Sequence, residues 1–278
     1  MISNSTITEA VDSGRFTLTT GIVSPKDTET LTRSIEGLAG AVDAVVVSYG
    51  EDTGMAGIAA CVHLQNAGIQ PILELSTRDM NRIALKSAII GASSLGIKSI
   101  ICTAGTHQTL TCTKEARGVF DIDPVQLLLA AQELQNGAQM LTGTTINPFA
   151  EPMELHILTL QKAAQAGARF AITAPVFDID RMIRWIEIIK QRKDSFDKLH
   201  IIAGVLPLET PAEALKLREK YRWLDLPDRI IEKISLDFAA ETARELSKMD
   251  GIRGVHIHPA YDDRAKRVLD MSGLSRKH

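Results

Sequence analysis

The sequence has few cysteines, few aromatic residues and no long apolar run, and each shortage excludes a class of protein. Three cysteines, Cys61, Cys102 and Cys112, cannot build a disulfide framework, and their spacing matches no zinc site. No run reaches the ~18 apolar residues of a transmembrane helix, and the polar N-terminus lacks the apolar core of a signal peptide. We therefore expect no membrane span and a reducing, cytoplasmic location, with Cys61 and Cys102 in the core and Cys112 in a loop.

An excess of charge of one sign is also lacking. Lysine and arginine number 31 against 34 aspartates and glutamates, which gives a formal net charge of −3. No basic block is present that would follow a phosphate backbone, so we expect no nucleic-acid partner. Hydrophobic residues at 45% and charged residues at 23% are typical of a globular protein with a large core.

What the sequence does contain is a repeated pattern of short apolar runs followed by amphipathic segments. Each run is apolar through most of its length, which is typical of a strand buried on both faces of a parallel sheet. The runs predict eight strands, at residues 15–23, 42–48, 71–76, 99–103, 139–146, 170–174, 199–205 and 254–258.

Apolar residues at helical spacing occupy the segments between these runs. We expect a lead-in over residues 1–14, a loop over 106–119 and a basic tail over 275–278. Trp185 and Trp223 lie in amphipathic helical context and are expected to pack. The predicted helices cover residues 28–38, 54–67, 124–135, 154–166, 179–191, 211–222, 227–249 and 264–273, and one more runs from a polar start at 77–79 to Gly96.

Eight strand–helix units within 278 residues predict an α/β protein with one domain, a single (β/α)8 TIM barrel spanning residues 1–278. An open, doubly wound sheet is the alternative architecture. A dinucleotide-binding sheet of that kind carries a glycine-rich turn after its first strand, and no such turn follows any of the eight runs. The pattern therefore favours the closed barrel.

Short segments spread along the chain carry a family resemblance. They are 47–50 (VSYG), 78–85 (RDMNRIAL), 120–127 (FDIDPVQL), 147–150 (NPFA), 166–168 (AGA) with 172–173 (IT), 176–178 (VFD) and 203–207 (AGVLP). In this order and spacing they resemble the methylenetetrahydrofolate reductase family, the flavin-bearing barrels of one-carbon metabolism, over residues 17–274. The resemblance implies a barrel, reduced folate as substrate or carrier, FAD as a possible cofactor, and a homo-oligomer.

Three positions that carry the chemistry of that family differ in this chain. By the resemblance, Gly21 replaces a glutamate that acts as general acid, Thr106 replaces an aspartate after strand four, and Ala174 replaces a glutamine after strand six. Glycine has no proton to donate, and loss of a positioned acid costs ~10²–10⁴-fold in rate. The resemblance therefore describes a divergent member whose chemistry has departed from flavin-based reduction.

The positions that hold the flavin depart as well. The resemblance puts Ala104 and Ala163 where the family has an arginine and a lysine, His156 where it has an aspartate, and Glu74 where it has histidine or glutamine. We hypothesise a tetrahydrofolate-linked enzyme that transfers a methyl group between reduced folate and another carrier, such as a corrinoid protein. The alternatives are a flavin-dependent 5,10-methylenetetrahydrofolate reductase with Glu74 as relocated acid, and a non-catalytic subunit of a reductase or methyltransferase complex.

Glu74 is the first catalytic candidate. Within strand 71–76 Leu73 and Leu75 face the helices by alternation, so Glu74 and Ser76 face the barrel interior. A lone interior carboxylate is costly unless it is paired or functional, and a structural ion pair is the alternative to a catalytic role. His107 is the second candidate because it follows strand four on the face where barrel enzymes work, the alternative being a solvent-exposed residue.

The substrate-binding candidates lie near the C-terminal ends of the strands. Hydroxyl groups there either orient a pterin or cap the next helix, and an N-cap is the simplest role for an aspartate. His256 and His258 share one face of strand eight, but we predict no metal. The candidates are Thr20, Ser48, Tyr49, Ser76, Thr103, Gly105, Thr106, Phe120, Asn147, Thr173 and Asp178.

Overall fold

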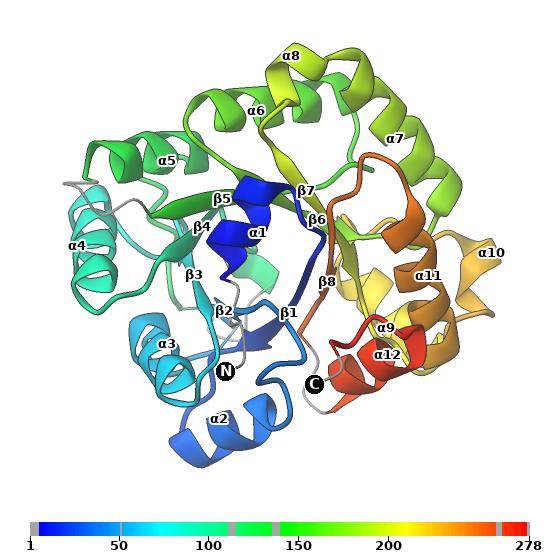
Figure 1. The fold of residues 1–278 in the computed structure, drawn as a ribbon, viewed down its shortest axis with the longest axis horizontal. Coiled ribbons are helices and arrows are strands. Elements are labelled where there is room, and N and C mark those ends of the chain that lie inside the picture. Colours follow the sequence, from blue (N-terminus) through cyan, green and yellow to red (C-terminus); the bar gives the residue numbers. More distant parts are fainter. Residues whose placement is uncertain (1–5, 51, 111–114, 135–139, 260–262, 277–278) are drawn as a thin grey trace.

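The computed structural model is a closed barrel of eight parallel strands surrounded by helices (Figure 1). It describes residues 6–50, 52–110, 115–134, 140–259 and 263–276. The strands pair in chain order, and β1 closes the barrel by pairing in parallel with β8. The prediction of a single (β/α)8 TIM barrel is confirmed.

All eight expected strands are present, with ends within two residues of those expected. Each strand is buried on both faces, by the helices on one side and by the barrel interior on the other, which explains its apolar sequence. The strands are β1 (Thr17–Val23), β2 (Ala44–Ser48), β3 (Pro71–Ser76), β4 (Ser99–Thr103), β5 (Leu141–Ile146), β6 (Phe170–Pro175), β7 (His200–Val205) and β8 (Gly254–Ile257).

The helices follow the expected alternation and start at identifiable caps. The side chains of Asp27, Asn81, Asp123 and Thr210, for example, each accept a hydrogen bond from a backbone N–H in the first turn. The helices are α1 (Ile7–Ser13), α2 (Thr28–Ile35), α3 (Gly57–Asn66), α4 (Arg82–Ser94), the 3₁₀ turn η1 (Gln108–Leu110), α5 (Pro124–Glu133), α6 (Met153–Gln165), α7 (Ile179–Gln191), α8 (Lys193–Phe196), α9 (Pro211–Lys220), α10 (Asp228–Ile231), α11 (Leu236–Lys248) and α12 (Arg264–Ser272).

The structure corrects the expectation for the N-terminal lead-in. Residues 7–13 form helix α1, which begins at a capping box made by Thr6 and Glu9. Ile7 and Val11 of this helix join the apolar cluster inside the barrel. Figure 1 shows α1 lying across one end of the barrel. The lead-in therefore closes the N-terminal end of the barrel, opposite the strand ends where barrel enzymes bind substrate.

Three helical expectations are also corrected. Helix α4 begins at Arg82 behind an Asn81 cap, not at residues 77–79, and Ile83 on it is 73% exposed. The stretch 227–249 contains two helices, α10 and α11, because a new N-cap at Ser235 restarts the helix. The predicted helix over 211–222 ends at Lys220, so Trp223 lies in a turn.

Some expectations fall on residues outside the described ranges. These are Cys112, the helix end at Gln135 with its stop at Gly137, the start of strand five at Gln139, and the last two residues of the basic tail. Within the described part of the chain, no helix has the length and apolar character needed to cross a membrane.

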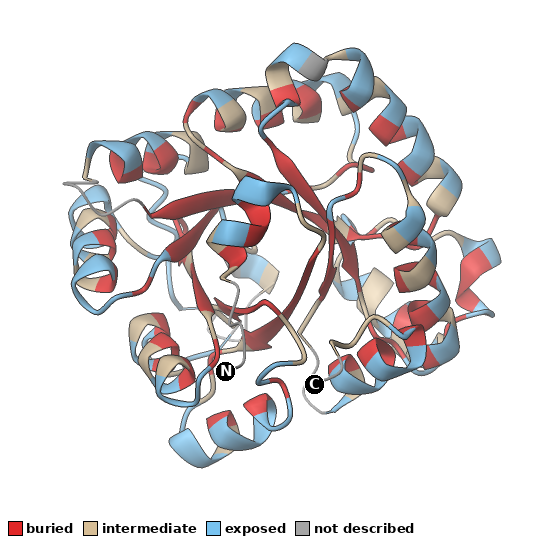
Figure 2. Ribbon diagram, in the orientation of Figure 1, coloured by how far each residue is buried: buried red, intermediate tan, exposed pale blue. Residues whose placement is uncertain are grey.

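The core has two layers separated by the barrel wall. Outward-facing strand residues such as Leu73 and Leu75 pack with the helices in one large cluster, which includes Cys61 and Cys102 as expected. Inward-facing residues form a second cluster, with Phe170 and Ile202 among its members. Figure 2 shows the buried strands at the centre and the exposed outer faces of the helices. This inner apolar layer is the floor on which the functional end of the barrel is built.

A third, smaller core lies beside the barrel. Phe177 and Leu208, which follow β6 and β7, pack against Leu224, Leu226 and Ile230 from the segment around α9 and α10. These contacts hold the chain between α9 and α10 at the C-terminal end of the barrel. Trp223 belongs to this segment but not to its core, because its side chain is 48% exposed.

Candidate functional site

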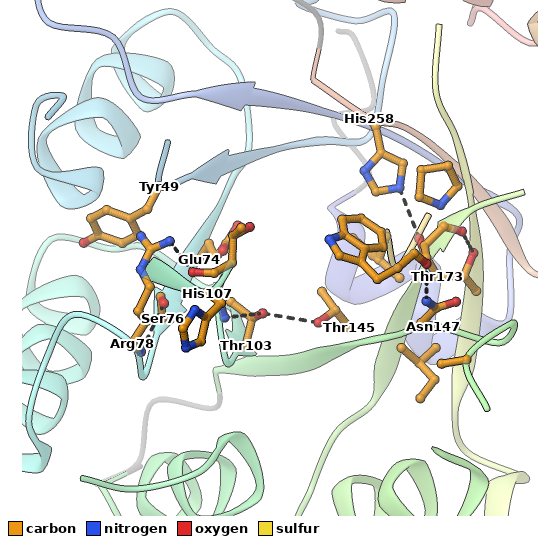
Figure 3. A pocket seen from close by; sticks show the side chains of 18 of the residues that line it. Tyr49, Glu74, Ser76, Arg78, Thr103, His107, Thr145, Asn147, Thr173 and His258 are labelled. Carbon is orange, nitrogen blue, oxygen red and sulfur yellow. Dashed lines mark hydrogen bonds between the residues drawn. The ribbon is translucent and has the colours of Figure 1, made fainter. Parts of the chain in front are cut away.

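A cavity of about 500 Å³ opens at the C-terminal ends of β3 to β6 and β8 (Figure 3). This is the face where barrel enzymes place their chemistry. Most of its surface is apolar, with polar groups at a few points, which is typical of a site for a small organic ligand. Its lining is Tyr49, Glu74, Ser76, Arg78, Thr103, Gly105, Thr106, His107, Leu110, Thr145, Ile146, Asn147, Ala150, His156, Ile172, Thr173, Ala174, Pro175, Trp223 and His258.

Glu74 is the carboxylate of this cavity. It points inward from β3, as alternation predicts, while Leu73 and Leu75 on either side are fully buried against the helices. Burial raises the pKa of Glu74 from its ordinary 4.5 to about 7, although a hydrogen bond from Ser48 and the charge of Arg78 favour the ionised form. Glu74 is therefore partly protonated at neutral pH.

Arg78 borders the cavity, and its guanidinium hydrogen-bonds to other groups of the protein. Its Nε and Nη2 atoms each donate to a different oxygen of Asp79 at 2.7 Å, and Nη1 donates to the Thr106 carbonyl oxygen at 2.8 Å. The guanidinium thereby links the loop after β3 to the loop after β4. Only 5% of the residue is exposed, so its charge acts on Glu74 mainly through the protein.

Hydroxyl groups and a close backbone approach shape the wall next to Glu74. Thr145 on β5 donates to the hydroxyl oxygen of Thr103 on β4 at 3.3 Å, and the Gly105 N–H donates to the same oxygen at 3.2 Å. Gly105 has a φ of +77°, and a Cβ on it would lie 2.3 Å from Oγ of Ser76. A residue with a side chain would therefore be strained and would push Ser76 into the cavity.

The opposite wall carries a neutral histidine. Nε2 of His258 lies 3.1 Å from the Thr173 carbonyl oxygen, so it carries the proton and leaves Nδ1 as an acceptor. Burial lowers the pKa of His258 to about 4 and lowers the pKa of His256, whose ring lies 4.9 Å away, well below its usual range. Figure 3 shows His258, Thr173 and Asn147 facing Glu74 and Thr103 across the cavity.

Asn147, at the end of β5, ties a distant segment to the cavity. Its Nδ2 donates to the Trp223 carbonyl oxygen at 3.1 Å, and its Oδ1 accepts from the Phe149 N–H at 3.0 Å. The indole of Trp223 borders the cavity. The expectation that Trp223 packs within a helix is therefore wrong, whereas Trp185 is fully buried as expected.

The structure brings nine of the candidate residues together around this cavity. They come from the ends of β2 to β6 and the loops that follow, which sequence alternation placed at one end of the barrel. His107 is exposed, and its Nδ1 lies 2.9 Å from the Thr109 hydroxyl. The nine are Glu74, His107, Tyr49, Ser76, Thr103, Gly105, Thr106, Asn147 and Thr173.

Four candidates lie outside the cavity lining. Thr20 points away from the barrel interior and donates to the Ile257 carbonyl oxygen, and Asp178 caps α7 and pairs with Arg229. Phe120 is 46% exposed in the loop before α5. Ser48 does not line the cavity, but it hydrogen-bonds to Glu74 and so acts on the site through that carboxylate.

Eleven lining residues were not among the sequence candidates, and five of these carry polar or aromatic side chains. Thr145 and His258 were accessible to the same alternation argument that identified Glu74, because they face inward from β5 and β8. Arg78 was present in a family segment, and His156 was noted only as a departure from the family. Trp223 had no sequence signal, since its place depends on the packing of the α9–α10 segment.

The described residues of the cavity offer no cluster of cations for the pyrophosphate of FAD. Among the described lining residues Arg78 is the one permanent cation, and its guanidinium is bonded to Asp79 and to a backbone carbonyl. Ala163, where the resemblance places a family lysine, is 2% exposed and packs in the core beneath α6. A second, polar hollow between α2 and α12 is lined by Arg33 and Lys266, and Glu74 is not among its lining residues. Within the described residues no group of three or more metal-ligating side chains is assembled.

The closed barrel, with a cavity at the C-terminal ends of its strands, defines a TIM-barrel protein. Within that class the chain belongs to the methylenetetrahydrofolate reductase family, whose family model matches residues 6–256. The resemblance found in the sequence is confirmed. Among curated proteins, none matches this chain.

Solved structures share the fold at low identity. A protein from Clostridium thermocellum, described as binding two copies of 5-methyl-5,6,7,8-tetrahydrofolic acid, is 12% identical with a TM-score of 0.69, covering 96% of this chain and 97% of that one. The 2,3-dimethylmalate lyase, of the PEP mutase/isocitrate lyase superfamily, is 16% identical with a TM-score of 0.58, covering 94% and 80%. Oxaloacetate acetylhydrolase is 11% identical with a TM-score of 0.51, covering 89% and 77%.

Proposed function

We propose that this protein binds a reduced folate in the cavity and transfers a methyl group from its N5 atom to a second carrier. The observation that carries the proposal is Glu74, an inward-facing carboxyl whose pKa of about 7 suits it to donate a proton at neutral pH. Family membership and the methyltetrahydrofolate bound by the Clostridium thermocellum protein support folate as the ligand class.

Glu74 supplies what methyl transfer from N5 requires. The carboxylic acid protonates N5, the carrier's nucleophile attacks the methyl carbon, the N5–methyl bond breaks, and its electron pair stays on N5. With a cobalt(I) corrinoid as nucleophile, the products are tetrahydrofolate and a methyl–cobalt(III) corrinoid. The Ser48 hydroxyl and the charge of Arg78 stabilise the carboxylate that remains.

The rest of the cavity is suited to hold a pterin rather than to move electrons. Thr103, Thr145 and Ser76 offer hydroxyls next to Glu74, and His258 offers a neutral Nδ1 acceptor from the opposite wall. A pterin ring carries both N–H donors and a carbonyl acceptor, so it can satisfy groups of both kinds. Methyl transfer needs no hydride donor, so the proposed reaction requires no flavin.

Single-turnover transfer to free cob(I)alamin tests the proposal. Protein and 5-methyltetrahydrofolate should convert it to methylcobalamin, followed by its visible absorption, and Glu74→Gln should slow this by ~10²-fold or more. The matched control is Glu187→Gln, which changes an exposed glutamate on α7 and should leave the rate unchanged. No methylcobalamin above the protein-free rate would refute methyl transfer.

The same purified protein also distinguishes methyl transfer from the two alternative functions, a flavin-dependent reductase and a non-catalytic subunit. A flavin-dependent reductase would be yellow as purified or would take up FAD on reconstitution. A non-catalytic subunit would bind no pterin and would require a protein partner for any folate-linked effect. Visible absorption and folate titration of the isolated chain distinguish both from the proposed methyltransferase.

A further inference from the structure

We propose that the outer faces of α3, α4 and α5 bind a second copy of this chain, and that α4 packs antiparallel on the α4 helix of that copy about a two-fold axis at Ser87. The three helices are adjacent, and Figure 1 shows them on one flank of the barrel, across from α7 and α11. The inference does not depend on the proposed function, because this flank lies outside the barrel and away from the cavity lining.

Large apolar side chains are exposed on this flank. On α4, Ile83 is 73% exposed and Ile90 is 55% exposed, and on α5 Leu129 is 49% exposed. Ile83 and Ile90 are seven residues apart, so they lie on the same side of the helix, about two turns from each other. A helix that faces only water carries polar residues on that side. The outward side of α4 is therefore built like a contact surface.

The same flank carries little charge, and its charges are paired within the chain. Helix α3 contains no Asp, Glu, Lys or Arg, α4 contains Arg82 and Lys86, and α5 contains Glu133. Arg82 pairs with Asp121, and Lys86 pairs with Glu133. By contrast, α7 and α11 each contain five such residues among 13. A partner that covers this flank must itself lack unpaired charge, because burying one is costly. A second copy of the chain meets this requirement.

The outward side of α4 is complementary to itself in shape. In an antiparallel pair with Ser87 on the two-fold axis, Ile83 lies opposite the partner subunit's Gly91. In the same pair, Ile90 lies opposite the partner subunit's Ala84. Each contact occurs twice, as a two-fold interface requires. A large side chain thus meets a small residue at every position, which lets the side chains of one helix enter the grooves of the other.

Gly91 gives an independent indication that another helix approaches α4. Outside its own helix, the described residues place a single atom, Cδ1 of Ile58 at 3.9 Å, within 4 Å of a Cβ built on Gly91. The packing of this chain therefore does not require glycine there, although glycine inside a helix is less stable than alanine. A partner side chain seated over Gly91 accounts for the missing Cβ.

The flank is large enough for a dimer. Helix α4 has 13 residues and spans about 20 Å. Three helices at a spacing of about 10 Å give an area on the order of 600 Å² per subunit, or about 1,200 Å² for the pair. This total lies at the lower end of specific, stable interfaces. We therefore expect a dimer at micromolar protein concentrations.

Sedimentation velocity tests the dimer and its interface. At micromolar concentrations the wild type should have twice the 30.3 kDa mass of one chain. Ile90→Glu puts a charge into the apolar contact and should raise the dissociation constant by about 10²-fold or more. The matched control is Ile183→Glu, which changes a 40% exposed isoleucine on α7 and should sediment like the wild type.

Gly91→Leu separates the interface from the fold of the single chain. A Cβ at this position has room within the chain, so the midpoint of urea unfolding for the monomer should not fall. The new side chain would occupy the space of the partner subunit's Ile83, and the dissociation constant should rise by about 10-fold or more. A wild-type dissociation constant in this variant would contradict the antiparallel α4 contact.

Disulfide cross-linking tests the position of the two-fold axis. Cys61 and Cys102 are buried, and a Cys112→Ser background removes the third cysteine. In this background Ser87→Cys should give a disulfide-linked dimer on mild oxidation, because two copies of residue 87 meet on the axis. Ser93→Cys is the matched control, since residue 93 is exposed on the side of α4 that carries Lys86, and it should stay monomeric on a reducing-agent-free gel.

Each outcome decides the proposal. A wild type that is monomeric at all concentrations, a dimer that Ile90→Glu leaves intact, or equal cross-linking of the two cysteine variants overturns it. A wild-type assembly larger than a dimer supports it if Ile90→Glu halves the mass and overturns it otherwise. If Ile90→Glu does not fold, the cross-linking of Ser87→Cys against Ser93→Cys decides.

Discussion

Replacing Glu74 by glutamine should make the protein more stable at alkaline pH while it removes activity. Glutamine keeps the shape of the side chain and can still accept the hydrogen bond from Ser48, but it cannot ionise. In the wild type the folded-state pKa of about 7 lies above the ordinary value of 4.5. The folded protein therefore retains a proton that the unfolded chain loses between pH 4.5 and 7.

The size and sign of the effect follow from proton linkage. Because the folded state binds more protons in this window, the free energy of unfolding falls as pH rises from 4.5 to 7, and the loss is complete above 7. A shift from 4.5 to about 7 corresponds to about 3 kcal/mol at most. Glu74→Gln lacks this loss, so its stability relative to the wild type should increase by up to that amount between pH 4 and pH 8.

Urea unfolding of both proteins at pH 4.5, 6 and 8 measures this difference. Subtraction cancels the titration of every other group, since the two chains differ at one position. Glu187→Gln, on the exposed face of α7, is the matched control at each pH. A difference between Glu74→Gln and the wild type that is constant across these pH values would refute the reasoning, because Glu74 would then not be desolvated in the folded state.

Three further predictions concern the barrel that holds the site. Burial lowers the pKa of His200 and of His258 to about 4. Because the unfolded chain binds protons at higher pH than the folded chain, the free energy of unfolding should fall as pH drops from 6.5 to 4. In urea titrations, His200→Gln should lose about 3 kcal/mol less stability than the wild type over that window. Gly143→Ala should destabilise the protein by about 1–3 kcal/mol, measured by urea unfolding, because the new Cβ would lie 2.3 Å from the Phe170 ring. Asp43→Asn should lower the free energy of unfolding by about 2–3 kcal/mol, because it removes a buried carboxylate that pairs with two arginines and accepts from a backbone N–H. An unchanged stability would show that these pairs contribute nothing.

The periodic part of the fold could be predicted because burial leaves a direct pattern in the sequence. Most residues of β3 and β4 are apolar, and the bounds of both strands match the expected ones. The inward direction of Glu74 followed from the same alternation. Helix α1 could not be predicted from periodicity alone, because a seven-residue helix with three buried side chains carries too little pattern.

The site was predictable where it depends on strand ends and not where it depends on packing across the fold. Thr20 was expected near the end of its strand, but it lies in the middle of β1 on the outward phase and donates to the Ile257 carbonyl oxygen of β8. Trp223 reaches the cavity only because Leu224 and Leu226 anchor its segment in a separate core. The pKa of Glu74 likewise depends on burial that only the assembled barrel creates.

Calorimetric titration of the isolated protein with 5-methyltetrahydrofolate tests the central claim most directly, namely that the Glu74 cavity is a reduced-folate site. The wild type should give a saturable binding heat, and this heat should weaken in Glu74→Gln and stay unchanged in Glu187→Gln. A wild-type titration with no saturable heat, or one that Glu74→Gln leaves unaltered, would contradict the account.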